Sequence, residues 1–161
     1  RVVESDMAAV STLGVDALSL YAISWIGHGV PYADLTAAAV AQWDWVRGQG
    51  IPVVPNVTAG WDNRPFHLHP TDWYPDPGPN SWVRQARPAE IAAHLKDALA
   101  WVDKWPDTAP ANTVIIYAWN EFAEGGWISP TLAAYGGTNR LDALRPLLTG
   151  CGPSVSPPQR P

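Results

Sequence analysis

Three short apolar runs, each followed by a segment of helical periodicity, constrain the fold of this chain more than any other feature. The runs that we expect to form strands cover residues 17–24, 51–57 and 113–118. The expected helices cover residues 34–47, 88–105 and 139–148, after a short leading helix at residues 4–13. Strands that alternate with helices in this way are typical of parallel sheets with right-handed crossovers. The expected fold class is therefore α/β.

Three strand–helix units are less than half of a (β/α)₈ TIM barrel, which typically has about 250 residues. We interpret residues 1–149 as the C-terminal portion of such a barrel, with a small three-layer α/β domain as the alternative. A sheet of three strands has open edges, so we expect the missing barrel half or another chain to cover them. Residues 150–161 are proline-rich and are expected to form a disordered tail. The sequence begins at Arg1 without an initiator methionine, which indicates an excised or processed piece.

Composition excludes several classes of function. The net charge is −5 and the sequence has no basic run, so we expect no nucleic-acid partner. No apolar stretch approaches the roughly 20 residues of a membrane span. The single Cys151 excludes an intramolecular disulfide framework and a cysteine-based zinc site. His67 and His69 have the spacing of two metal ligands but lack a further ligand nearby, so we expect a surface loop, no metal and no cofactor.

Two carboxylates follow the third expected strand. Glu121 and Glu124 are three residues apart, and on a helical turn their Cβ atoms would lie roughly 5–6 Å apart. That separation is compatible with the roughly 5–5.5 Å between the carboxyl groups of retaining glycosidases. In such a pair one carboxyl protonates the leaving oxygen, and the other stabilises the developing charge or activates the nucleophile. The structural alternative is that one glutamate caps a turn and the other is solvated.

Aromatic and amide side chains surround this pair and follow the other strands. The sequence has ten tryptophans and two phenylalanines, a balance that fits stacking on sugar rings as well as core packing. Trp61, Asp62 and Asn63 follow the second strand and could bind sugar hydroxyls and a ring face; the alternative is an Asp-Asn turn beside a packed tryptophan. Other candidate binding residues are Tyr21 and Trp25 after the first strand, and Trp119, Asn120 and Trp127 beside the glutamates.

Two blocks of this sequence resemble a known family. Ala-Trp-Asn-Glu-Phe-Ala-Glu-Gly at 118–125, followed by Ile-Ser-Pro-Thr at 128–131 and Tyr-Gly at 135–136, looks like the Asn-Glu-(aromatic)-X-Glu-Gly signature of glycoside hydrolase family 99-like proteins. That group includes endo-α-mannosidases and related domains from bacterial polysaccharide gene clusters. Gly-Trp-Asp-Asn-Arg-Pro at 60–65 is similar to a second block of the same group.

The resemblance implies a role for each glutamate. Glu121 matches the residue that deprotonates the sugar 2-hydroxyl, which then attacks its own anomeric carbon. Glu124 matches the residue that acts as acid and then as base, so configuration is retained without a covalent enzyme intermediate. The sequence departs from the endo-mannosidase pattern at Ala123, where a histidine is usual, and at Phe66, where related domains tend to carry a basic residue. Both departures leave the specificity for mannosides open.

The expected function is that of a retaining glycoside hydrolase acting on an oligosaccharide or polysaccharide. Two alternatives remain: a non-catalytic carbohydrate-binding module and a polysaccharide-biosynthesis protein. We also expect a secreted or extracytoplasmic location.

Overall fold

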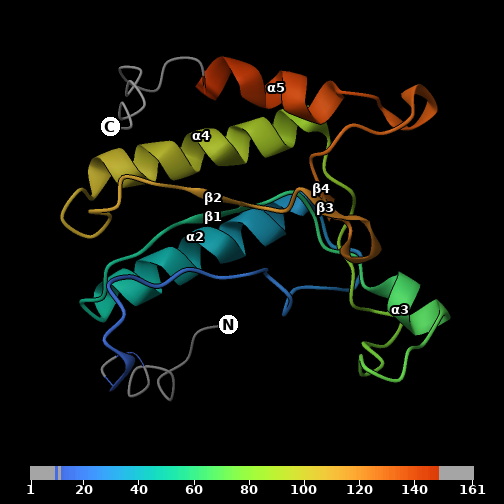
Figure 1. Cartoon of the computed structure of the whole chain (residues 1–161), viewed down its shortest axis with the longest axis horizontal. Helices are drawn as coiled ribbons and strands as arrows, with labels where there is room; N and C mark the ends of the chain where they lie inside the picture. Colours follow the sequence, from blue (N-terminus) through green and yellow to red (C-terminus); the bar gives the residue numbers. More distant parts are fainter. Residues whose placement is uncertain (1–9, 11, 149–161) are drawn as a thin grey trace, which may run out of the picture.

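The computed structural model describes residue 10 and residues 12–148 (Figure 1). Over these residues the chain is a mixed α/β structure with few strands. The expected leading helix at 4–13 lies largely outside the described residues, and the tail at 150–161 lies wholly outside them. Gly14, which we expected to end that helix, has a φ of +64°, and its N–H donates to the Val10 carbonyl at 3.1 Å.

The parallel sheet consists of β1 (Asn56–Thr58) and β2 (Ile115–Tyr117). The expected strand at 17–24 is wrong as a strand, because a single isolated parallel bridge, Leu18 to Val53, pairs it with the next segment. Pro52, next to that bridge, has no N–H to donate towards the segment at 17–24, so the hydrogen-bond ladder does not extend in that direction. The three segments nevertheless lie side by side in the order of the sequence.

Two long helices carry the buried face that the sequence predicts. Helix α2 (Tyr32–Gly48) begins two residues before Asp34, which therefore lies in its first turn and is not its N-cap. Helix α4 (Pro88–Lys104) begins at its proline, as expected, and Arg87 and Glu90 form a capping box there. The third expected helix is α5 (Asn139–Leu148).

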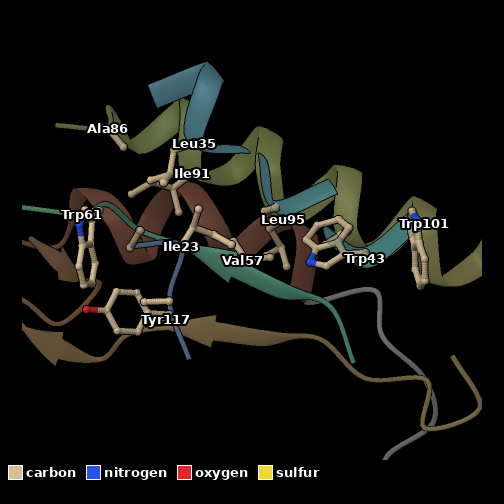
Figure 2. Packing of buried hydrophobic residues seen from close by; sticks show 14 of the residues in the cluster. Ile23, Leu35, Trp43, Val57, Trp61, Ala86, Ile91, Leu95, Trp101 and Tyr117 are labelled. Carbon is tan, nitrogen blue, oxygen red and sulfur yellow. The ribbon is translucent and has the colours of Figure 1, made fainter. Parts of the chain in front are cut away.

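Both long helices cover the same face of the sheet. Helices α2 and α4 each pack against β1 and contact one another, and α5 lies along α4 (Figure 1). In Figure 2, Trp43 of α2 and Leu95 of α4 lie near Val57 of β1, and all three side chains are less than 3% exposed. In the alternative, a three-layer α/β domain, helices would cover both faces of the sheet. Here α2 and α4 lie on one face.

The segments between these elements contain more structure than expected. The expected loop at 58–87 includes a short helix, α3 (Arg64–Leu68), and isolated bridges join Asp62 to Trp82 and Val30 to Val83. After β2 the chain forms β3 (Asn120–Glu121), a 3₁₀ turn η1 (Phe122–Glu124) and β4 (Gly126–Trp127), followed by a second 3₁₀ turn, η2 (Ala133–Tyr135). Within the described residues, no helix has both the length and the apolarity needed to cross a bilayer.

Candidate active site

The two glutamates lie on a tight hairpin, not on the α-helical turn that their spacing suggested. Glu121 is the last residue of β3 and pairs with Gly126 of β4, while Glu124 ends the 3₁₀ turn between the two strands. Gly125 follows with a φ of +72°, and its N–H donates to the Phe122 carbonyl. A left-handed residue directly after one turn prevents an α-helix from continuing, so the chain reverses and both glutamates stay in one compact loop.

Two tyrosines lie beside the glutamates. The hydroxyl of Tyr117, the last residue of β2, donates to the Glu124 carboxylate. The Tyr21 and Tyr117 rings meet edge to face, with centroids 4.8 Å apart. The charges of both glutamates act on the Tyr21 phenol, so the two tyrosines and the two carboxylates lie at one locus.

The pKa values of both phenols are raised. Burial, followed by the hydrogen bond and the negative charge of Glu124, raises the pKa of Tyr117 far above its usual range. Burial, followed by the charges of Glu124 and Glu121, raises the pKa of Tyr21 to about 12. At neutral pH both tyrosines are therefore protonated, and Tyr117 donates its proton to the hydrogen bond with Glu124.

Glu124 faces an open cleft. The cleft has a volume of about 570 Å³ and is lined by Leu20, Tyr21, Ala22, Ser24, Trp61, Asn63, Tyr74, Pro77, Ser81 and Glu124. An adjoining pocket of about 260 Å³ contains Trp25 and shares Ser24, Pro77 and Ser81 with the cleft. The structure thus brings together four of the candidate binding residues, Tyr21, Trp25, Trp61 and Asn63, from segments that follow two of the expected strands.

Hydrogen bonds fix two of these side chains in the wall of the cleft. Trp61 is only 5% exposed, and its indole N–H donates to the Ser81 hydroxyl at 3.2 Å. The Asn63 amide donates to the Tyr74 hydroxyl at 2.8 Å. Trp61 is therefore a packed wall of the cleft and exposes little of its ring face.

The remaining candidates have other surroundings. Asp62 accepts from the Arg64 guanidinium at 2.9 and 2.6 Å, so its carboxylate is paired within its own turn. Trp119 is 55% exposed, and it and Asn120 lie on the hairpin outside the residues that line the cleft. Trp127 is half-buried, and the Arg140 guanidinium stacks on its ring at 3.9 Å.

The two sequence blocks touch through their backbones. The Asp62 N–H donates to the Glu124 carbonyl at 2.7 Å. A Cβ on Gly60 would lie 2.4 Å from the Gly125 carbonyl oxygen, and a Cβ on Gly125 would lie 2.8 Å from the Asp62 backbone nitrogen. Glycines at 60 and 125 therefore allow the cleft wall and the carboxylate hairpin to approach closely.

Two residues of the site were not identified as such from the sequence. Tyr117 was assigned only to the third strand, although its position as the last strand residue before the glutamates was an available signal. Tyr74 lies in the long loop and has no motif around it, so its hydrogen bond with Asn63 depends on tertiary structure. Sequence spacing cannot show such a partner.

The site offers carboxylates and hydroxyls and shows no metal-binding cluster. Within the described part of the chain, no group of three or more His, Cys, Asp or Glu side chains could hold a metal ion. His67 lies 2.8 Å from Asp76 through its Nδ1 atom. The available chemistry is proton transfer and hydrogen bonding.

Comparison with known proteins found similarity to a solved structure. Neither a scan of protein-family models nor a search of curated proteins found a match. A solved structure similar to this chain is the GH99 endo-alpha-mannosidase from Bacteriodes thetaiotaomicron in complex with BIS-TRIS-Propane, with 17% sequence identity and a TM-score of 0.47. The similarity covers 88% of this chain. The chain spans 41% of the length of that solved chain.

Proposed function

We propose that this chain carries the two-carboxylate site of a glycan-cleaving hydrolase and is a portion of a (β/α)₈ barrel. The observation that carries the proposal is the pair Glu121 and Glu124 on one hairpin beside an open cleft, with Tyr117 donating to Glu124. Hydrolysis of a glycosidic bond needs an acid for the leaving oxygen and a second carboxylate for the anomeric centre. The sequential parallel segments with helices on one face support the barrel.

The role of Glu124 follows from its position in the cleft wall, and the role of Glu121 follows from the family resemblance. Glu124 lines the cleft and would protonate the leaving oxygen, then activate water as a base. Glu121 would remove the proton of the sugar 2-hydroxyl, whose oxygen then attacks the anomeric carbon as the leaving group departs. Water opens the resulting intermediate and restores the 2-hydroxyl, so the configuration is retained. Tyr117 donates to Glu124 and orients that carboxylate during both proton transfers.

Substitution of Glu124 tests the reaction. Glu124→Gln removes the proton donor without changing side-chain size, so the rate should fall on the order of 10²- to 10⁴-fold. The measurement is reducing-sugar release from a panel of α-linked glycans, mannans included, with circular dichroism to confirm the fold. Glu90→Gln on the first turn of α4 is the matched control, because glutamine also serves in a capping box, and its turnover should equal that of the parent chain.

Two outcomes would contradict the hydrolase. Undiminished turnover in Glu124→Gln would show that Glu124 is not the acid. Oligosaccharide binding without any product from the parent chain would favour a carbohydrate-binding module instead.

The positioning role of Tyr117 has a separate test. Tyr117→Phe removes the donor to a carboxylate, an interaction worth about 1.5–3 kcal/mol, so kcat should fall about tenfold or more. KM should change little, because Tyr117 is not among the residues that line the cleft. A variant with unchanged kcat and a raised KM would assign Tyr117 to substrate binding and not to Glu124.

A further inference from the structure

A second cavity lies between the segment that follows β4 and the start of α4. Its volume is about 250 Å³, and neither glutamate of the hairpin lines it. The polar groups around it are Gln85, Ser129, Thr131, Tyr135, Asn139 and Arg140. Ser129, Thr131 and Tyr135 belong to the part of the first sequence block that the carboxylate site does not use.

Arg140, in the first turn of α5, provides the charge of this cavity. Its Nη1 atom donates to the Trp127 carbonyl at 2.5 Å and to the Ala59 carbonyl at 3.4 Å, and its Nη2 atom donates to the Ala86 carbonyl at 3.5 Å. These partners are neutral dipoles, and among the described residues no carboxylate forms an ion pair with it. By contrast, a carboxylate pairs with each of four other arginines, Arg47, Arg64, Arg87 and Arg145.

The charge of Arg140 is half-buried as well as unpaired. Burial lowers the pKa of Arg140, which expresses the cost of holding the cation away from water, and the Tyr32 phenol offsets that effect only in part. A buried charge without a counter-ion is unfavourable, so an anion that enters the cavity would gain a strong electrostatic interaction. The positive end of the α5 helix dipole acts in the same direction.

A second group in the cavity lacks a partner. The Ser129 hydroxyl oxygen is inaccessible to solvent and has no hydrogen bond within the described part of the chain. Buried hydroxyls are normally hydrogen-bonded, but protein atoms cover this oxygen, so a ligand in the cavity does not reach it and Arg140 carries the interaction. Ser129 and Arg140 both line the cavity.

We infer that this cavity binds the carboxylate of an acidic sugar, such as a uronic acid unit. The planar guanidinium of Arg140 matches a carboxylate in two parallel hydrogen bonds. No lysine and no second arginine lines the cavity, so a single negative charge fits it better than a doubly charged phosphate. Its volume is below the roughly 300–1,000 Å³ of drug-sized ligand pockets, which suits one sugar ring surrounded by hydroxyl and amide groups.

The cavity is continuous with the carboxylate hairpin in the sequence. Trp127 lines it and directly follows Gly126, the register partner of Glu121. Assigning the acidic sugar to the glycan that the enzyme cleaves rests on the proposed function. The binding of the carboxylate itself does not.

Calorimetric titration of the whole chain with single sugars tests the inference. D-Glucuronate and D-galacturonate should bind at least tenfold more tightly than D-glucose and D-galactose, which lack the carboxylate. The same titration is carried out with acetate, inorganic phosphate and sulfate. Equal affinities for uronates and neutral sugars would overturn the inference, and so would tighter binding of phosphate or sulfate than of either uronate.

Variants locate the binding to the cavity. Arg140→Gln should remove the preference for uronates, and Arg140→Lys should weaken it at least threefold because the fork of donors is lost. Arg145→Gln, on the exposed face of the same helix, is the matched control and should bind as the parent chain does. An unchanged uronate affinity in a folded Arg140→Gln variant would overturn the assignment.

Arg140→Lys also covers the case in which Arg140→Gln does not fold. A weakening of at least threefold in Arg140→Lys then supports the site, and unchanged affinity overturns it. Glu124→Gln separates the two proposals, because it should lose hydrolysis and keep uronate binding. A chain that cleaves neutral glycans but binds no uronate refutes only this inference, whereas one that binds uronate and cleaves nothing refutes only the hydrolase.

Discussion

At the scale of single residues, His94 shows how burial changes the chemistry of a side chain. It lies on α4 and stacks on Trp43 with ring centroids 5.5 Å apart and an interplanar angle of 5°. Neither of its ring nitrogens has a hydrogen-bond partner among the described residues. Burial lowers the pKa of His94 to about 4, so the imidazole is neutral in the folded chain at neutral pH.

The first prediction concerns acid stability. In the unfolded chain the pKa of His94 returns to about 6.5, so between pH 6.5 and 4 the unfolded state binds a proton that the folded state does not. The part of the free energy of unfolding that depends on His94 is therefore fully present above pH 6.5. It is lost as the pH falls towards 4, by at most about 3 kcal/mol. Urea unfolding at pH 7 and pH 4.5 measures the loss, and His94→Phe should show a smaller decrease than the parent chain. Equal decreases in the two proteins would contradict the prediction.

Single residues also mark the limit of prediction from sequence. The sequence identified Asp62 as a candidate sugar ligand. In the structure the Arg64 guanidinium, two positions later, donates to the Asp62 carboxylate. It identified Glu121, Glu124 and Tyr21 but not Tyr117, which donates to Glu124. Residue types report which chemistry is available, whereas partners depend on how distant segments meet.

At the scale of elements, helices were predicted better than strands. The apolar stripes of α2 and α4 repeat over several turns, so their buried faces could be identified before the structure was known. The segment at 17–24 has the composition of a strand but forms one bridge, and Pro52 on its partner has no N–H to extend the ladder. The spacing of the glutamates is compatible with a helical turn, but a left-handed glycine after one 3₁₀ turn prevents an α-helix there. Local pattern therefore predicts long elements, and single special residues decide the short ones.

The second prediction separates backbone strain from crowding at the hairpin. Gly125 and Gly50 have nearly equal φ values of +72° and +75°, but a Cβ on Gly50 would meet nothing within 4 Å. Gly50→Ala should therefore lower the free energy of unfolding by about 1–2 kcal/mol, the strain of an alanine in the left-handed conformation. Gly125→Ala must also move Asp62 away, so it should lose more stability and, in addition, hydrolytic activity. Thermal unfolding of both variants measures this, and equal losses would argue against the close backbone contact.

At the scale of the whole molecule, the sheet has an open side. Strand β2 pairs with β1 and with no other strand among the described residues, and Ile115 is 46% exposed. An unpaired apolar edge favours association with another strand. The three neighbouring segments and their one-sided helices could be anticipated from element order, but what covers the open edge could not.

The third prediction follows from that edge. The chain should self-associate at high concentration, and Ile115→Lys should shift sedimentation towards the monomer because a charge on an edge strand opposes pairing. Ala100→Lys, on the exposed side of α4, adds the same charge elsewhere and should leave the association unchanged. Equal sedimentation of the parent chain and Ile115→Lys at all concentrations would exclude the β2 edge as the contact.

The bridge between Asp62 and Trp82 closes the base of the long loop. The Asn63 N–H donates to the Ser81 carbonyl at 2.8 Å, and the Val83 N–H donates to the Trp61 carbonyl at 2.8 Å. The two ends of the loop at residues 64–80 therefore lie side by side. Within the loop, α3 packs against the 3₁₀ turn η1 that carries Glu124, and Arg64 pairs with Asp62. Tyr74 and Pro77, which line the cleft, lie beyond α3 in the same loop. Exchange of residues 69–80 would therefore change the wall of the cleft and leave α3 in place against the turn of the carboxylates.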